Sequence, residues 1–150
     1  MTGTELRVGD ELPPLRLEPV SRTTLALFAG GSGDHNPVHI DLDAARGAGM
    51  DDVFAHGMLS MAYVGRFLTA WAPQERLRSL RVRFTAITPV HARPVCSGTV
   101  SAIEDGDGER RATIRLTVRL ADGTTTLTGE ATVALDPLTK GTENDDEVGR

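Results

Sequence analysis

The segment Gly57-Met-Leu-Ser-Met-Ala-Tyr-Val-Gly-Arg-Phe-Leu-Thr-Ala-Trp71 decides the fold. Its apolar residues cover nearly the whole circumference of a helix, and Pro73 ends it. A helix that is apolar on all sides is expected to be buried. At 1.5 Å per residue it would be roughly 22 Å long, too short to cross a membrane comfortably. The segment therefore predicts a central helix buried inside a globular domain.

The spacing of apolar residues changes after this helix. Four stretches place an apolar residue at every second position: 79–86, 96–102, 111–120 and 126–133. Such alternation is typical of strands with one buried and one solvent-exposed face, and turns rich in Gly, Pro and Asp separate the stretches. A buried helix followed by such strands predicts an α+β domain of the hot-dog arrangement, in which an antiparallel sheet wraps around a long central helix.

The residues before the central helix predict two short elements. We expect a strand at Leu15–Val20 and a helix at Arg22–Ala29, with Ser21 as its N-cap. The glycine-rich stretch at residues 30–33 is expected to end that helix. Its buried contacts are expected from Leu25, Leu27 and Phe28.

The composition limits the classes of function. The chain has 150 residues, a formal net charge of −5 and one cysteine, Cys96. The lack of a basic excess argues against a nucleic-acid partner, and one cysteine excludes an internal disulfide and a cysteine-rich zinc site. With no signal-peptide-like run and no charge-free segment of about 18 residues, we expect a cytoplasmic protein without a membrane partner. We expect one domain at residues 1–136 and a disordered acidic tail at 137–150.

The segment Gly33-Asp34-His35-Asn36-Pro37-Val38-His39 carries the candidate chemistry. Proline disfavours a helical conformation in the preceding residue, so the segment is expected to be a shaped loop that aims Asp34 and His39 at one point. A carboxylate beside an imidazole forms an acid–base pair whose pKa values can be tuned near neutrality. We assign Asp34 and His39 as catalytic residues that hold a water molecule, with His39 exchanging a proton with a substrate carbon. Asn36 is assigned an orienting role.

The start of the central helix supplies a second candidate element. The first N–H groups of a helix have no internal partner and lie at the positive end of its dipole. Gly57 is therefore a candidate to stabilise an oxyanion through its N–H, since glycine lets a ligand approach the backbone closely. His56 and Ser60 join Asn36 as candidate substrate-binding or orienting residues. This acid–base chemistry needs no cofactor and no metal, and we expect neither.

The order of these motifs resembles a known family. The stretches Phe28–His39 and Ala55–Leu59 are similar to the motifs of the MaoC-like (R)-specific enoyl hydratases and (3R)-hydroxyacyl-thioester dehydratases, and the resemblance covers roughly residues 5–135. It implies that Asp34 and His39 are the catalytic pair and Gly57 the oxyanion glycine. It further implies a hydro-lyase that interconverts (3R)-hydroxyacyl and trans-2-enoyl thioesters in fatty-acid or polyketide metabolism.

A closer similarity involves residues 22–29, 69–71 and 82–86, which resemble the catalytic B subunit of heterodimeric (3R)-hydroxyacyl-ACP dehydratases, where ACP is the acyl carrier protein. The resemblance implies acyl-ACP or acyl-CoA as the substrate, and a homodimer or a heterodimer with a second hot-dog subunit. Two alternatives stay open: a hot-dog acyl thioesterase, because the fold also hosts thioester hydrolysis, and a non-catalytic acyl-binding subunit. The intact Asp34–His39 pair argues against both.

Overall fold

The computed structural model describes residues 5–135. The acidic tail expected at residues 137–150 lies outside the described residues, and the boundary of the domain at residue 136 stays a prediction. Within residues 5–135, no helix is long and apolar enough to span a membrane.

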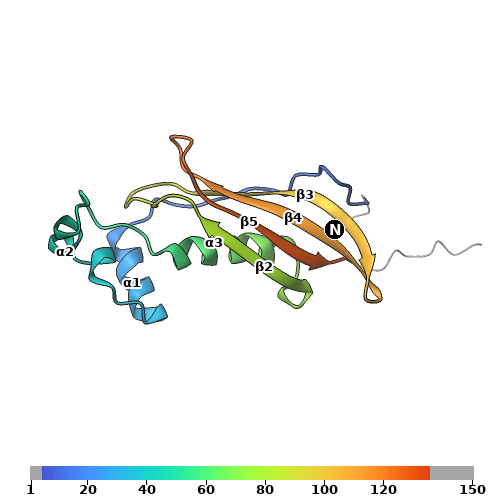
Figure 1. The fold of residues 1–150 in the computed structure, drawn as a ribbon, viewed down its shortest axis with the longest axis horizontal. Helices are drawn as coiled ribbons and strands as arrows, with labels where there is room; N and C mark the ends of the chain where they lie inside the picture. The colour runs from blue at the N-terminus through green and yellow to red at the C-terminus, as the bar shows by residue number, and fades with distance from the viewer. Residues whose placement is uncertain (1–4, 136–150) are drawn as a thin grey trace, which may run out of the picture.

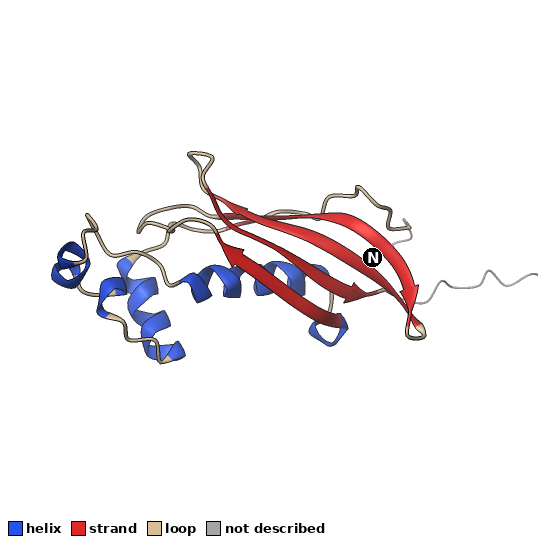
Figure 2. Ribbon diagram, in the orientation of Figure 1, coloured by secondary structure: helices blue, strands red, loops and turns tan. Residues whose placement is uncertain are grey.

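One curled antiparallel sheet and one long helix dominate the structure (Figure 1). The strands follow the order β1-β3-β4-β5-β2 across the sheet. Helix α3, at Gly57–Trp71, runs along the inner face of the sheet (Figure 2). The predicted α+β hot-dog arrangement is confirmed. The strands are β1 (Leu15–Arg16), β2 (Leu77–Phe84), β3 (Val95–Gly106), β4 (Glu109–Arg119) and β5 (Thr125–Ala134).

The predicted alternation places the core on the inner face of the sheet. Cys96 and Val100 of β3 are buried, and in β4 every second residue from Ala112 to Val118 is buried as well. Gly98 lies between them, where an added Cβ would be 2.9 Å from Ile114 Cγ2 and 3.0 Å from Phe67 Cε1. Because Gly98 has no side chain, the Phe67 ring of α3 can pack directly against the sheet at this position.

The bounds of the central helix agree with the prediction, but its burial does not. Leu59, Val64, Phe67 and Leu68 are buried, whereas Met58 is 54% exposed and the opposite side of α3 contains further exposed residues. The expectation of burial around the whole circumference is wrong for the described chain. The sheet curls around one side of the helix only (Figure 2), so the other side is left uncovered by residues 5–135.

The N-terminal elements differ from the prediction in extent. Strand β1 has only two residues, and helix α1 runs from Arg22 to Ser32, which is three residues past the predicted end at Ala29. The Ser21 hydroxyl caps α1 as predicted, accepting a hydrogen bond from Thr24 N at 3.0 Å. The helix ends within the predicted glycine-rich stretch, at Gly33, whose φ of 76° lies in the left-handed region. Leu27 is 71% exposed, contrary to its predicted burial.

A second, smaller core holds the motif region against the start of α3. It joins α1, the short helix α2 (Leu42–Gly47) and the first turn of α3. Figure 1 shows α1 and α2 beyond the N-terminal end of α3. This arrangement brings the loop after α1 next to the first turn of α3. The buried members are Val20, Leu25, Ala45, Val53, Ala55, Leu59 and Val90.

Candidate active site

Two side chains of the motif shape the loop between α1 and α2. Asp34 Oδ1 accepts a hydrogen bond from Asn36 N at 3.2 Å, and Asn36 Oδ1 accepts one from Val38 N at 3.3 Å. Asp and Asn commonly fold the backbone in this way. Pro37 then starts a single 3₁₀ turn that ends at His39. The local sequence thus carries the chain from an exposed Asp34 to a buried His39 within six residues.

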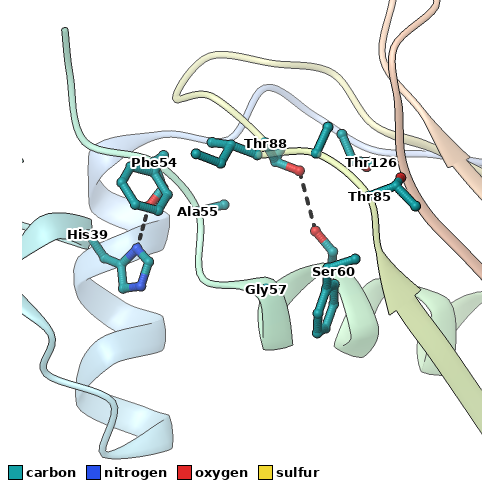
Figure 3. Close-up of a pocket in the computed structure, with 11 residues that line it drawn as sticks. His39, Phe54, Ala55, Gly57, Ser60, Thr85, Thr88 and Thr126 are labelled. Atoms are coloured by element: carbon teal, nitrogen blue, oxygen red, sulfur yellow. Dashed lines mark hydrogen bonds between the residues drawn. The ribbon is translucent and has the colours of Figure 1, made fainter. Parts of the chain in front are cut away.

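The ring of His39 is held in one orientation by the backbone. Its Nδ1 lies 2.7 Å from the carbonyl oxygen of Phe54 (Figure 3). A carbonyl only accepts hydrogen bonds, so Nδ1 is the protonated nitrogen and donates. In neutral His39 this leaves Nε2 with a free lone pair, which is the form that a general base requires.

His56 connects the motif loop to the start of α3. Its ring is 1% exposed, and Nε2 donates to the carbonyl oxygen of Asp34 at 3.1 Å. The ring lies between two others, with its centroid 4.0 Å from that of His39 and 4.9 Å from that of Phe28. Its Nδ1 is buried and has no hydrogen-bond partner among residues 5–135. Burial lowers the pKa of His56, so the ring is kept neutral.

Asp34, His39 and His56 form one cluster. A carboxylate oxygen of Asp34 and one ring nitrogen of each histidine lie within 4.8 Å of one another. Two imidazoles and a carboxylate are also a common ligand set for transition metals. However, His56 Nε2 uses its proton on the Asp34 carbonyl, and His56 Nδ1 is buried. These hydrogen bonds favour a proton-handling pair, Asp34 and His39, supported by His56.

A pocket of about 370 Å³ opens beside His39 at the N-terminal end of α3. Its size lies at the lower end of the range of small-molecule sites. One wall carries hydroxyl groups, including the buried Ser60 and Thr88, whose oxygens lie 3.4 Å apart (Figure 3). The pocket thus has apolar walls with a few polar groups. It is lined by His39, Phe54, Ala55, Gly57, Ser60, Phe84, Thr85, Ala86, Ile87, Thr88 and Thr126.

Gly57 is the first residue of α3 and lines this pocket. The residue before it, His56, forms no side-chain cap. Leu59 N donates to the His56 carbonyl oxygen at 3.1 Å, and no side chain caps the turn. The Gly57 N–H is therefore the candidate donor to a ligand at the positive end of the helix dipole.

The structure brings together only some of the residues assigned from the sequence. His39, Gly57 and Ser60 line the pocket. Asp34 and His56 do not line it but lie beside His39. Asn36 contributes its side chain to the turn of the loop, not to the pocket wall.

The sequence analysis missed the wall formed by residues 84–88 together with Phe54 and Thr126. It expected Phe84 and Ala86 to continue the buried face of a strand, whereas β2 ends at Phe84 and both side chains are exposed. The apolar Ile87 and the polar Thr88 that follow break the regular alternation. That break could have shown where the strand ends, but not that its end forms a pocket wall.

Comparisons with known proteins agree on one family. The MaoC like domain matches residues 7–121. A mitochondrial 3-hydroxyacyl-[acyl-carrier-protein] dehydratase of Arabidopsis thaliana is 30% identical over 138 residues, which cover 90% of this chain and 81% of that one. An (R)-specific enoyl-CoA hydratase of Rhodospirillum rubrum is 30% identical over 114 residues, covering 76% and 78% of the two chains.

Solved structures give the same result for the fold. The ChsH1–ChsH2 complex from Mycobacterium tuberculosis contains a chain that superposes with a TM-score of 0.77 at 26% sequence identity. The match covers 88% of this chain and 100% of that one. The similarity therefore extends over most of this chain and the whole of the other.

Proposed function

The chain belongs to the family of the MaoC like domain, and on this basis we propose that it is a hydro-lyase that interconverts (3R)-hydroxyacyl and trans-2-enoyl thioesters in fatty-acid metabolism. The observation that carries the proposal is that a carboxylate oxygen of Asp34 lies within 4.8 Å of a ring nitrogen of His39, which itself lines the pocket. Relatives that are named dehydratase and enoyl-CoA hydratase support the same reaction class.

We assign the proton transfer to His39. In dehydration, His39 Nε2 takes the proton from C2 of the hydroxyacyl group, since its Nδ1 is occupied by the Phe54 carbonyl. The electrons left on C2 form the double bond to C3 as the hydroxyl group leaves. That hydroxyl takes the proton back through the Asp34–His39 pair and departs as water, so both side chains return to their starting state. Hydration follows the same path in reverse.

We assign the Gly57 N–H the role of stabilising the negative charge that develops on the thioester oxygen. An unpaired N–H at the start of α3 is already oriented, so it needs no rearrangement as the charge forms. A donor of this kind typically contributes about 10²–10³ in rate. His56 acts through its hydrogen bond to the Asp34 backbone and its contact with His39, so it is a positioning residue. Ser60 is assigned a substrate-contacting role in the pocket wall.

A hot-dog dimer is the expected assembly. Strand β2 lies at one edge of the sheet, and such an edge presents unpaired backbone groups that a second subunit would cover. The similar ChsH1–ChsH2 structure is itself a complex of two proteins. For this chain we propose a homodimer or a heterodimer with a second hot-dog subunit, a cytoplasmic location, and acyl-CoA or acyl-ACP as the substrate.

Product analysis tests the proposed function. Purified protein is mixed with crotonyl-CoA and, separately, with crotonyl-ACP, and the products are identified by mass spectrometry and chiral chromatography. We expect the (R)-3-hydroxybutyryl thioester on at least one carrier, without release of free thiol. Release of free thiol without hydration would instead identify a thioesterase. Binding of both substrates without any turnover would identify an acyl-binding subunit.

A further inference from the structure

The ring of Phe84 packs closely against Gly57. An ideal Cβ at Gly57 would lie 3.3 Å from Phe84 Cε2 and 3.4 Å from both Cδ2 and Cζ. Distances below 3.4 Å are tighter than ordinary van der Waals contact. Glycine at position 57 thus lets the aromatic ring pack directly against the first turn of α3.

The backbone around Phe84 is fixed while its ring stays partly free. Phe84 is the last residue of β2, and the next residue is tied to the neighbouring strand through Thr85 N to Thr126 O at 2.9 Å and Thr85 Oγ1 to Thr125 O at 2.7 Å. The Phe84 side chain is nevertheless 48% exposed and lines the pocket. It therefore stands at the pocket mouth, with one side on Gly57.

We propose that Phe84 determines specificity at C2 of the acyl group and restricts the site to thioesters that are unbranched at this carbon. The inference rests on the proposed function, in which the Gly57 N–H binds the thioester oxygen. That contact places C1 and C2 of the acyl group beside Gly57, and hence beside the ring that covers it. A methyl group on C2 would compete with the ring for the same space.

The ring has little freedom to yield in the direction of the helix. Movement toward Gly57 is blocked by the contact already made there, and movement of the strand is opposed by the two hydrogen bonds of Thr85. Rotation outward would expose more of an apolar ring that is already half exposed. One methyl group in an apolar pocket changes kcat/KM by about 10–200-fold, which sets the size of the expected selectivity.

The test compares crotonyl and 2-methylcrotonyl thioesters on the same carrier. The measured quantity is kcat/KM for hydration of the crotonyl thioester divided by kcat/KM for the 2-methylcrotonyl thioester. The intrinsic effect of the methyl group on reactivity is the same in every variant, so it cancels when variants are compared. We expect the ratio to fall at least about 10-fold in Phe84→Ala. Phe84→Leu, which retains most of the bulk, should give a smaller fall, and it serves as the test variant if Phe84→Ala does not fold. Met58→Ala is the matched control, since Met58 is also half exposed and adjacent to Gly57 but does not line the pocket.

The outcomes separate the two proposals. An unchanged ratio in a Phe84 variant that still hydrates crotonyl thioester overturns the specificity role and leaves the proposed function intact. A fall of equal size in Met58→Ala also overturns it, since the effect would then not belong to Phe84. Wild-type protein that hydrates neither thioester on either carrier overturns the proposed function and this inference with it.

Discussion

The imidazole rings of His39 and His56 stack with centroids 4.0 Å apart and planes inclined by 31°. His39, in the motif loop, donates a hydrogen bond to the carbonyl oxygen of Phe54, which lies just before α3. His56, also just before α3, donates one to the carbonyl oxygen of Asp34 in the motif loop. The stack therefore joins the motif loop to the residues that lead into α3. Positive charges on two rings this close would repel each other, and this repulsion adds to the burial that lowers the pKa of His56.

His56→Phe should separate the positioning role from proton transfer. The variant retains an aromatic ring for the stack but loses the hydrogen bond to Asp34, so we expect the free energy of unfolding to fall by about 0.5–1.5 kcal/mol in urea titrations. His56→Phe should also remove the part of the pH dependence of stability that comes from His56. Burial depresses the folded pKa of His56 below its ordinary value of 6.5, so its contribution to stability is complete above pH 6.5 and is lost as pH falls through the folded pKa.

The melting temperature should therefore decrease more steeply from pH 7 to pH 5 in the wild type than in His56→Phe. If the melting temperatures of the two proteins fell equally between pH 7 and pH 5, His56 would not be the group that causes the pH dependence. Because Asp34 and His39 are retained in this variant, some hydratase activity should remain.

Gly57→Ala should lower kcat/KM, because the new Cβ would lie only 3.3 Å from Phe84 Cε2 and the ring would have to shift beside the bound thioester. A double-mutant cycle with Phe84→Ala tests this reason. If the ring causes the loss, Gly57→Ala should cost much less in the Phe84→Ala background. An equal cost in both backgrounds would show that the methyl group interferes with the substrate directly.

The sequence predicted the central helix and the interior of the strands because both depend on local patterns. Pro73 and a run of apolar residues define α3 without reference to the rest of the chain, and alternation defines β4 in the same way. The predicted end of α1 at Ala29 was wrong because the helix continues until Gly33 adopts a left-handed conformation. The glycines before it have no such requirement.

The candidate site was predictable only in part, for a physical reason. Asp34, His39 and Gly57 belong to short motifs whose chemistry can be recognised from residue types. The contact of Ser60 with Thr88 and the position of Phe84 over Gly57 join residues that are far apart in the chain. Such contacts are set by how β2 and α3 pack, and no local pattern encodes them.

Gly98→Ala tests how closely α3 packs against the sheet. The added methyl group would meet Ile114 and Phe67, so we expect a loss of about 1–3 kcal/mol in the free energy of unfolding. Gly106→Ala is the matched control in the same strand, because nothing lies within 4 Å of its Cβ position. A change of less than about 0.5 kcal/mol in both variants would contradict the packing described for Phe67.

An ion-pair network at the far end of the sheet should protect the fold against mild acid. Glu109 accepts hydrogen bonds from Arg78 Nε at 2.7 Å and Nη2 at 2.8 Å and from Arg111 Nε at 2.7 Å. The Arg78 and then the Arg111 hydrogen bonds lower the pKa of Glu109 to about 2 from its ordinary value of 4.5. Its contribution to stability is therefore present above pH 4.5 and lost as pH falls toward 2.

Glu109→Gln should consequently melt at a lower temperature than the wild type at pH 7, with the difference shrinking below pH 4.5. High salt should also reduce the difference, because the network is close to the surface. A difference in melting temperature that does not depend on pH would assign the effect to packing instead of charge.

The most direct test of the central claim is the initial rate of crotonyl-thioester hydration, followed by loss of the enoyl absorbance, in Asp34→Asn and His39→Ala beside the wild type. Removal of a positioned acid–base group typically costs about 10²–10⁴ in rate, so we expect each variant to lose activity by that factor while its circular dichroism spectrum stays unchanged. Wild-type rates in both folded variants would contradict the assignment of Asp34 and His39 as the catalytic pair.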